Sequence, residues 1–300
     1  MLSNLITFNI PFKTKYMQKI TLLIHCEDQP NIIASVTNFM ASNDGNIVYI
    51  DQHVDREQNI FFMRLECEFA SDSFSLEEFK QLFSSTLAEK FKLDWKIFAA
   101  ERKPKMALFI SKYDHCLYDI LGRYNSGELH LEIPFILSNH LDLKPIADNF
   151  NIPFYHVPVT KATKQEAEQE QLRLLESHNI DFIVLARYMQ IVSETLIDKY
   201  PNRIINIHHS FLPAFVGAKP YHSAYKRGVK IIGATSHYIT EELDAGPIIQ
   251  QDVAHVSHTH SIKDLIAKGR DLEKIVLSTA IKLHADRKVM VFNNKTVIFS

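Results

Sequence analysis

Five short apolar runs, separated by polar or helical stretches, constrain the fold of this chain more than any other feature. They are MALFIS, LEIPFILS, IPFYHVPV, DFIVLA and RIINIHH, and they lie between residues 106 and 209. The stretches between them include CLYDILGRYNSG, LKPIADNF and TKQEAEQEQLRLLESHN, whose leucines Leu172, Leu174 and Leu175 leave one side to pack. Strands that alternate with helices predict an α/β fold with a mostly parallel, Rossmann-like sheet. Ligands of such folds bind beyond the carboxyl ends of the strands.

The first hundred residues follow a different pattern. A strand (ITLLIHC) and a helix (IIASVTNFMASN) precede two strands (NIVYIDQHVD and IFFMRLECEF), a second helix (SLEEFKQLFSSTLAEK) and a last strand (LDWKIFA). This βαββαβ order predicts an antiparallel sheet with both helices on one face. Nothing in this half gathers nucleophiles or bases, so we expect the active site elsewhere.

A charged segment separates the two patterns. The stretch AERKPKM carries Pro104 and is typical of a connection between domains. We therefore expect an N-terminal extension at residues 1–16, a first domain at 17–100 and a second domain at 101–300. Met1 and Met17 both remain candidate start residues, because the first strand-like run begins only after Met17.

Composition limits the classes of partner. The formal net charge is −2, which argues against binding to nucleic acid or to an anionic membrane. The three cysteines are an odd number without C-x-x-C spacing, which is typical of the reducing cytosol. No apolar run approaches the roughly 20 residues that span a bilayer. We expect a cytoplasmic protein whose partner is a small molecule.

The stretch INIHHSFLPAF closes the fifth apolar run with an amide and two imidazoles. Side chains alternate along a strand, so Asn206 and His208 share one face and His209 leaves on the other. About thirty residues later, the stretch IIGATSHYITEELDAGPIIQQ places Asp244 in a turn, with Gly246 permitting a tight approach. An amide, an imidazole and a carboxylate in one crevice suit transfer or hydrolysis of an acyl group.

Simpler interpretations of the same residues stay open. Asn206 can satisfy backbone groups, His208 can be a packed core residue, and an Asp before Gly is ordinary turn chemistry. Four histidines could also hold zinc: His208, His209, His222 and His237. Adjacent histidines on a strand point in opposite directions, however, and neither an H-E-x-x-H motif nor a nearby cysteine is present. We therefore expect no metal.

The stretch NIHHSFLPAFVGAKPYHSAYKRGVKIIGATSHYITEELDAGPII resembles the catalytic region of the folate-dependent formyl transferase family. The resemblance covers residues 104–295 and implies a catalytic trio of Asn206, His208 and Asp244. It also implies that LARYMQIVS, residues 185–193, grips the pterin ring largely through backbone atoms. The residues expected to bind the substrate are Met189, Gln190, Val192, His237, Thr240 and Glu241.

Two features decide which branch of the family the chain resembles. Transferases that bind a phosphorylated amine have a glycine-rich loop after the first strand, whereas SKYDHCL, residues 111–117, contains no glycine. The first domain is similar to the ACT-type domain that formyltetrahydrofolate deformylases carry. The resemblance therefore implies hydrolysis of 10-formyltetrahydrofolate to tetrahydrofolate and formate, within one-carbon metabolism and purine biosynthesis. It implies no cofactor beyond the folate substrate.

The resemblance also assigns a role to each member of the trio. Asn206 would stabilise the oxyanion, His208 would deliver a proton, and Asp244 would orient the attacking water, directly or through the imidazole. Two alternatives keep the same residues. One is a formyl transferase that uses an unphosphorylated amine, and the other is a folate-binding sensor with vestigial catalytic residues.

The ACT-type domain implies regulation. An amino-acid effector, glycine or methionine first, would bind there, although Asn31 stands where such domains often have glycine. The predicted sheet would leave edge strands with unpaired backbone, and pairing them between copies is a common solution. We therefore expect a homo-oligomer.

Overall fold

The computed structural model of the chain describes residues 17–70, 74–214 and 220–300. Two compact units follow one another, Met1–Arg102 and Lys103–Ser300, so that the division falls close to the segment in which the sequence predicted it. The predicted extension at residues 1–16 lies outside the described residues.

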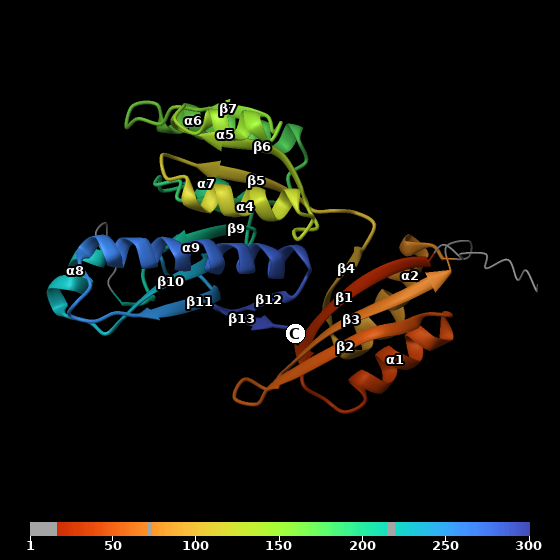
Figure 1. Cartoon of the computed structure of the whole chain (residues 1–300). Helices are drawn as coiled ribbons and strands as arrows, with labels where there is room; N and C mark the ends of the chain where they lie inside the picture. Colours follow the sequence, from red (N-terminus) through yellow and green to blue (C-terminus); the bar gives the residue numbers. More distant parts are fainter. Residues whose placement is uncertain (1–16, 71–73, 215–219) are drawn as a thin grey trace, which may run out of the picture. The chain divides into compact units, whose positions relative to one another are not determined.

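The first unit contains the predicted βαββαβ order (Figure 1). Its elements are β1 (Met17–Glu27), α1 (Ile32–Ser42), β2 (Asn46–Asp55), β3 (Ile60–Ala70), α2 (Leu76–Phe83), a π-helical turn at Ser84–Ala88, α3 (Glu89–Phe91) and β4 (Asp94–Ala99). The strands form an antiparallel sheet in the order β2-β3-β1-β4. The sheet leaves β2 and β4 as edges.

One face of this sheet packs on the helices. Alternate residues of β1 and β3, such as Leu22 and Leu65, are buried in the same cluster as Met40 of α1 and Phe83 of α2. The side chain of Ser75 caps α2 by accepting from the backbone N–H of Glu78, as its position before an acidic first turn predicts. Both helices therefore cover one face, which confirms the fold predicted for this half.

The second unit contains a seven-stranded sheet in the order β11-β10-β9-β8-β5-β6-β7. Its elements are β5 (Lys105–Ile110), α4 (His115–Asn125), β6 (Glu132–Ser138), α5 (Lys144–Asn149), β7 (Phe154–His156), α6 (Lys164–Ser177), β8 (Phe182–Ala186), α7 (Glu194–Lys199), β9 (Ile204–His208), α8 (Pro220–Arg227), β10 (Ile231–Tyr238), β11 (Ile248–His255), α9 (Ile262–Ala285), β12 (Val289–Phe292) and β13 (Lys295–Ile298). Strands β5 to β9 are parallel and β10 is antiparallel to both of its neighbours. The prediction of a mostly parallel sheet is confirmed.

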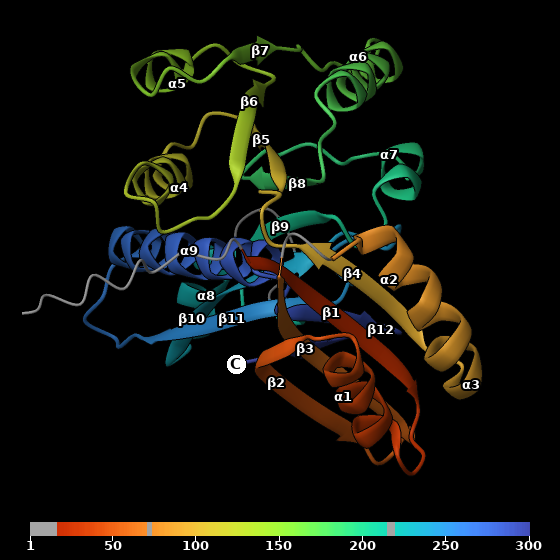
Figure 2. The same ribbon diagram turned by 90° about the vertical axis from the view of Figure 1, so that its right-hand side faces the viewer.

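The strand order creates a switch point between β5 and β8. The chain moves outward from β5 through β6 to β7, then returns to β8 and moves outward again through β9. Crossovers therefore leave the carboxyl ends of β5 and β8 in opposite directions, which opens a crevice between them. Figure 2 shows α4 and α9 on one side of this sheet and α6 and α7 on the other. Each side has its own buried core.

Several elements of this unit were not defined by the sequence analysis. They are α7, α8, α9 and the small β12-β13 sheet. Helix α9 is 24 residues long and begins with a capping box between Ser261 and Asp264. In the part of the chain that the structure describes, no helix is both long and apolar enough to cross a membrane.

Candidate active site

Strand β9 presents the amide and the imidazole as its alternation predicts. Ile205 and Ile207 belong to the core beneath α4 and α9, whereas Asn206 and His208 emerge on the opposite face. His208 ends the strand and is only 6% exposed. His209 follows the end of the strand, and its ring lies 5.3 Å from the ring of His208 and 6.0 Å from the ring of Tyr221, so the predicted departure to the opposite face is not seen.

The turn after β10 carries the carboxylate. Asp244 has a left-handed backbone with φ 57°, a conformation that Asp tolerates better than most residues. Gly246 follows, and a Cβ at this position would lie 1.9 Å from the carbonyl oxygen of Tyr238. A register shift between Ser236 and His237 adds a bulge to the β10–β11 ladder, a device that re-aims side chains next to sites. The glycine and the bulge together bring Asp244 back toward β9.

Four side chains converge at this point. Oδ2 of Asp244 lies 3.2 Å from Nδ1 of His208, and Oδ1 lies 3.7 Å from Nε2 of His237. Nε2 of His237 in turn lies 3.3 Å from the amide nitrogen of Asn206. The three residues predicted as a trio therefore meet, with His237 as a fourth member.

The role of His237 follows from its tautomer. Its Nδ1 lies 2.9 Å from the carbonyl oxygen of Tyr238, which can only accept, so Nδ1 carries a hydrogen. In the neutral ring Nε2 then has only a lone pair and accepts from the amide of Asn206. This fixes the orientation of the Asn206 amide and leaves its second N–H free. His237 is 2% exposed and thus positions Asn206 from the interior.

Asp244 is held in its ionised form. The hydrogen bond from His208 outweighs burial and keeps the pKa of Asp244 well below its ordinary value. Because Nδ1 of His208 donates to Asp244, Nε2 is the atom through which His208 exchanges protons with a ligand. Nε2 is buried and has no hydrogen-bond partner among the described residues.

A cleft of about 90 Å³ opens beside this group. Among the residues predicted for the site, those that line it are Gln190, Val192, Asn206, His237, Thr240, Glu241 and Asp244. The cleft is also lined by Leu185 and Ile191, which lie in the stretch 185–193 predicted to grip the pterin ring, and by residues that were not predicted, Ile197, Ile239, Glu242 and Leu243. Ile239, Glu242 and Leu243 each neighbour a predicted residue in sequence, whereas Ile197 lies on α7, which carries no predicted residue.

Met189 does not lie where the sequence analysis expected it. Its side chain is 53% exposed and is not among those that line the cleft. Arg187 and Met189 both have left-handed backbones, with φ 61° and 60°, so the side chains of this loop do not continue the alternation of β8. The loop itself is anchored by a hydrogen bond of 2.9 Å between Gln171 and the Tyr188 hydroxyl.

Comparison with known proteins agrees with both units. Residues 104–281 match the formyl transferase family model and residues 20–83 match the ACT domain model. A formyltetrahydrofolate deformylase from Synechocystis is 51% identical over 93% of this chain and 98% of its own length. The chain belongs to the formyltetrahydrofolate deformylase family. A member from Bacillus subtilis is 43% identical, covering 93% of both chains.

Solved structures place the chain in the same family. The deformylase from Pseudomonas syringae superposes with a TM-score of 0.91 at 46% identity, over 96% of both chains. A glycinamide ribonucleotide transformylase from Symbiobacterium toebii has a TM-score of 0.63 at 26% identity. It covers 68% of this chain and 97% of its own. This family therefore shares the transformylase fold and adds a further unit to it.

A separate buried group in the second unit has the composition of a metal site. In the ranges 17–70, 74–214 and 220–300, the one such group consists of His115, Cys116 and Glu273. Burial strongly raises the pKa of the Cys116 thiol, which disfavours the thiolate that a metal needs. Glu273 already accepts from His115 and from the hydroxyl of Tyr221. The donor set therefore fits a hydrogen-bonded network better than an ion.

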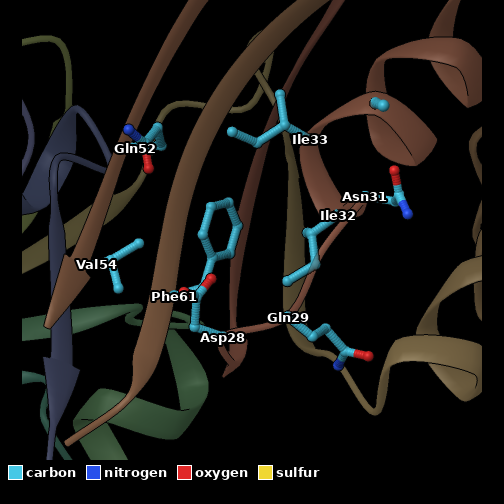
Figure 3. Close-up of a pocket in the computed structure, with 9 residues that line it drawn as sticks. Asp28, Gln29, Asn31, Ile32, Ile33, Gln52, Val54 and Phe61 are labelled. Carbon is cyan, nitrogen blue, oxygen red and sulfur yellow. The ribbon is translucent and has the colours of Figure 1, made fainter. Parts of the chain in front are cut away.

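The ACT-type unit of this family member holds the other pocket of interest, of about 310 Å³ (Figure 3). Ile33 of α1 and Val54 and Phe61 of the sheet supply apolar walls, and Asp28 supplies a carboxylate. Asn31 has φ 73° at the start of α1, a conformation that explains why glycine is common there and that Asn also adopts. The change from glycine thus leaves the turn intact.

Proposed function

We propose that the chain hydrolyses 10-formyltetrahydrofolate to tetrahydrofolate and formate. The observation that carries this proposal is the ionised Asp244, held by His208 next to an oriented Asn206 at the mouth of a cleft. The folate would occupy the cleft, and its formyl carbon would lie over these three groups. Membership of the deformylase family supports the same substrate.

Each group has one task in this reaction. Oδ1 of Asp244, which lies 3.7 Å from Nε2 of His237, accepts a hydrogen bond from the attacking water. As the water oxygen bonds to the formyl carbon, the free N–H of Asn206 stabilises the developing oxyanion. Protonated His208 gives its Nε2 proton to the leaving nitrogen, the C–N bond breaks, and the water supplies the two protons that restore His208 and accompany formate.

Hydrolysis is preferred over transfer because of the segment after β5. Residues 111–117 contain no glycine, and α4 begins at His115 without a glycine-rich turn. A phosphorylated amine would lack its usual backbone cradle there. Transfer to an unphosphorylated amine uses the same trio and is the second candidate function.

The deciding experiment measures formate and tetrahydrofolate released from 10-formyltetrahydrofolate, with and without candidate amines. We expect equal amounts of both products without any amine. Release that requires an amine would establish the transferase, and absence of turnover under all conditions would establish the sensor.

We also propose that the reaction needs no metal or cofactor and that it runs in the cytoplasm, where it would supply formate to one-carbon metabolism and purine biosynthesis. Dialysis against a chelator should leave the rate within about twofold, since the proposed steps are proton transfers and hydrogen bonds. Inactivation by the chelator that zinc reverses would contradict this proposal.

The pocket of the first unit would bind an amino-acid effector, glycine or methionine. The N-terminus of α1 suits a carboxylate, Asp28 suits an ammonium group, and Ile33 and Phe61 suit an apolar side chain. Edge strands β2 and β4 would pair between copies in a homo-oligomer. A chain that begins at Glu101 should therefore change its mass in light scattering and lose its response to both amino acids.

A further inference from the structure

The buried polar atoms that lack a partner fall in one row. Among the described residues there are five such side-chain atoms: Nδ1 of His115, Oδ1 of Asn139, Nε and Nη1 of Arg187, and Nε2 of His208. Their residues follow or end strands β5, β6, β8 and β9, which are neighbours in the order β6-β5-β8-β9. The row thus spans the switch-point crevice and reaches the catalytic His208. Unpaired buried polar groups are rare, and a row of them along the ligand-binding edge of a sheet indicates a ligand.

Arg187 is the most unusual member of this row. Its side chain is only 9% exposed, and its guanidinium stacks on Tyr113 with 4.8 Å to the ring centroid. Nη1 approaches Oε2 of Glu273 to 3.4 Å, but the contact lacks hydrogen-bond geometry. A buried guanidinium normally donates hydrogen bonds to carboxylates or carbonyls.

The carboxylate of Glu273 accepts no hydrogen bond from Arg187, because both of its oxygens already have other partners. Oε1 accepts from the Tyr221 hydroxyl at 2.8 Å, and Oε2 lies 2.9 Å from Nε2 of His115. The carboxylate is thus held without Arg187, although the charge of Arg187 helps to keep the pKa of Glu273 below its ordinary value against the effect of burial. The positive charge of Arg187 is balanced, while its Nε and Nη1 have no hydrogen-bond partner among the described residues.

The row and the folate cleft lie on different sides of the sheet. Leu185 and Ile197, which line the cleft, pack against the α6 and α7 face, whereas Arg187 reaches Glu273 on α9. The left-handed backbone of Arg187 produces this reversal, because regular alternation from Leu185 would direct both side chains to one face. His208 lies at the junction, with Nδ1 toward Asp244 on the cleft side.

We propose that Arg187 and His115 form a binding site for the formate product, separate from the folate cleft. This inference rests on the proposed hydrolysis, which supplies formate next to His208. A planar carboxylate matches the fork of a guanidinium, and the 9% exposure of the Arg187 side chain favours a small ligand over a large one. Nδ1 of His115 offers a lone pair in the neutral ring and an N–H in the protonated ring, so formate and the proton released with it can both be held. The two products would therefore leave from opposite sides of the sheet.

The test titrates ¹³C-formate onto the full-length chain and follows its NMR line width. Arg187→Met should weaken formate binding at least tenfold, and Arg187→Lys should fall between Arg187→Met and the wild type because it keeps the charge and loses the fork. Arg203→Met is the matched control, because Arg203 also stacks on a tyrosine, Tyr200, at 4.8 Å. It should leave formate binding unchanged.

Two measurements on the wild-type chain do not depend on how the variants fold. Saturating tetrahydrofolate should leave formate bound, because the sites are separate. Acetate, which is one methyl group larger, should bind at least tenfold more weakly than formate. Displacement of formate by tetrahydrofolate, equal binding of acetate, or formate binding that Arg187→Met does not change would each overturn the inference.

The outcome can be separated from that of the proposed function. If formate is released from 10-formyltetrahydrofolate but Arg187→Met does not change formate binding, only the product site is refuted. Formate bound at Arg187, without release of formate in the turnover assay, would refute only the hydrolysis.

Discussion

The two pockets of this chain contrast in how they hold their polar groups. In the second unit, Asp244 has a 13% exposed side chain, two imidazoles beside it and a strained turn that fixes it. In the first unit, the pocket is larger, its walls are mostly apolar, and Asn31 and Gln52 on its rim are exposed. Catalysis needs charges that are buried and fixed before the substrate arrives, whereas reversible binding of an effector needs mainly shape and a few exposed polar groups.

The largest effect should come from Asp244→Asn, which removes the fixed charge and keeps the volume. Turnover should fall at least about 100-fold, corresponding to roughly 3 to 4 kcal/mol in the barrier. Folate binding should change little, because most of the cleft is formed by other residues. Single-turnover rates and equilibrium folate binding check this, and retention of a third of the rate would exclude the assigned role.

Neighbouring histidines test the strand register. His208→Ala should lower turnover by about 100-fold, since general acid catalysis contributes that much or more. His209→Ala should cost less than about tenfold, because the imidazoles that pair with Asp244 are those of His208 and His237. Turnover rates of both variants decide the matter, and the reverse order would place the wrong histidine in the site.

A pair of glycines, one in each unit, sharpens the contrast. In Gly246→Ala the new Cβ would lie 1.9 Å from a backbone carbonyl, so the Asp244 turn must move and turnover should fall at least about tenfold. In Gly45→Ala the Cβ would lie 2.6 Å from Sγ of Cys67, which should cost the first unit about 1 to 3 kcal/mol of stability. The basal rate of Gly45→Ala should stay the same while the unit remains folded. If Gly246→Ala and Gly45→Ala lowered turnover equally, the Asp244 turn would have no special role in catalysis.

Acid should destabilise the second unit through His284. This residue is half-buried beside the Tyr238 hydroxyl, and burial, together with the charges of Arg287 and Arg203, lowers its pKa to about 3. Since the unfolded chain binds the proton at about pH 6.5, stability should fall below that pH by up to about 1.4 kcal/mol per pH unit, until the folded pKa is reached. Urea unfolding at a series of pH values should show a smaller change of stability with pH for His284→Gln, which keeps an acceptor for the Tyr238 hydroxyl. His258→Gln, at an exposed position, should unfold like the wild type.

The smallest effect concerns the pocket of the first unit. Asp28→Asn should weaken binding of the amino-acid effector by about fivefold, because a half-buried carboxylate at the edge of an open pocket contributes about 1 kcal/mol. Asp94→Asn, outside the pocket and in the same unit, should not change the affinity. Calorimetry with glycine and methionine measures both variants. If Asp28→Asn weakened effector binding by the same factor as Asp244→Asn lowers turnover, the two pockets would depend equally on a fixed charge.

Local sequence patterns were sufficient to predict the fold and most of the catalytic trio. Alternating apolar runs predicted the parallel strands, and the period of two in a strand predicted that Asn206 and His208 share a face. The stretch from Asn206 to Ile249 predicted the family, because the spacing of its polar residues is part of the sequence itself. Helix α9 and the β12-β13 sheet were not predicted because they carry no motif that the analysis used.

Only the tertiary structure decided which distant residues meet. Arg187, His115 and Glu273 come together because the strand order places the ends of β5 and β8 side by side beneath α9, and strand order is not a local property. The left-handed backbones at Arg187 and Met189 reverse the expected directions of their side chains, and such conformations are set by packing of the whole loop. The sequence by itself thus determined most of the helices and strands and the types of side chain at the site. Long-range packing determined the orientation of the Asn206 amide, which the tautomer of His237 fixes, and it left Nε and Nη1 of Arg187 without a partner among the described residues.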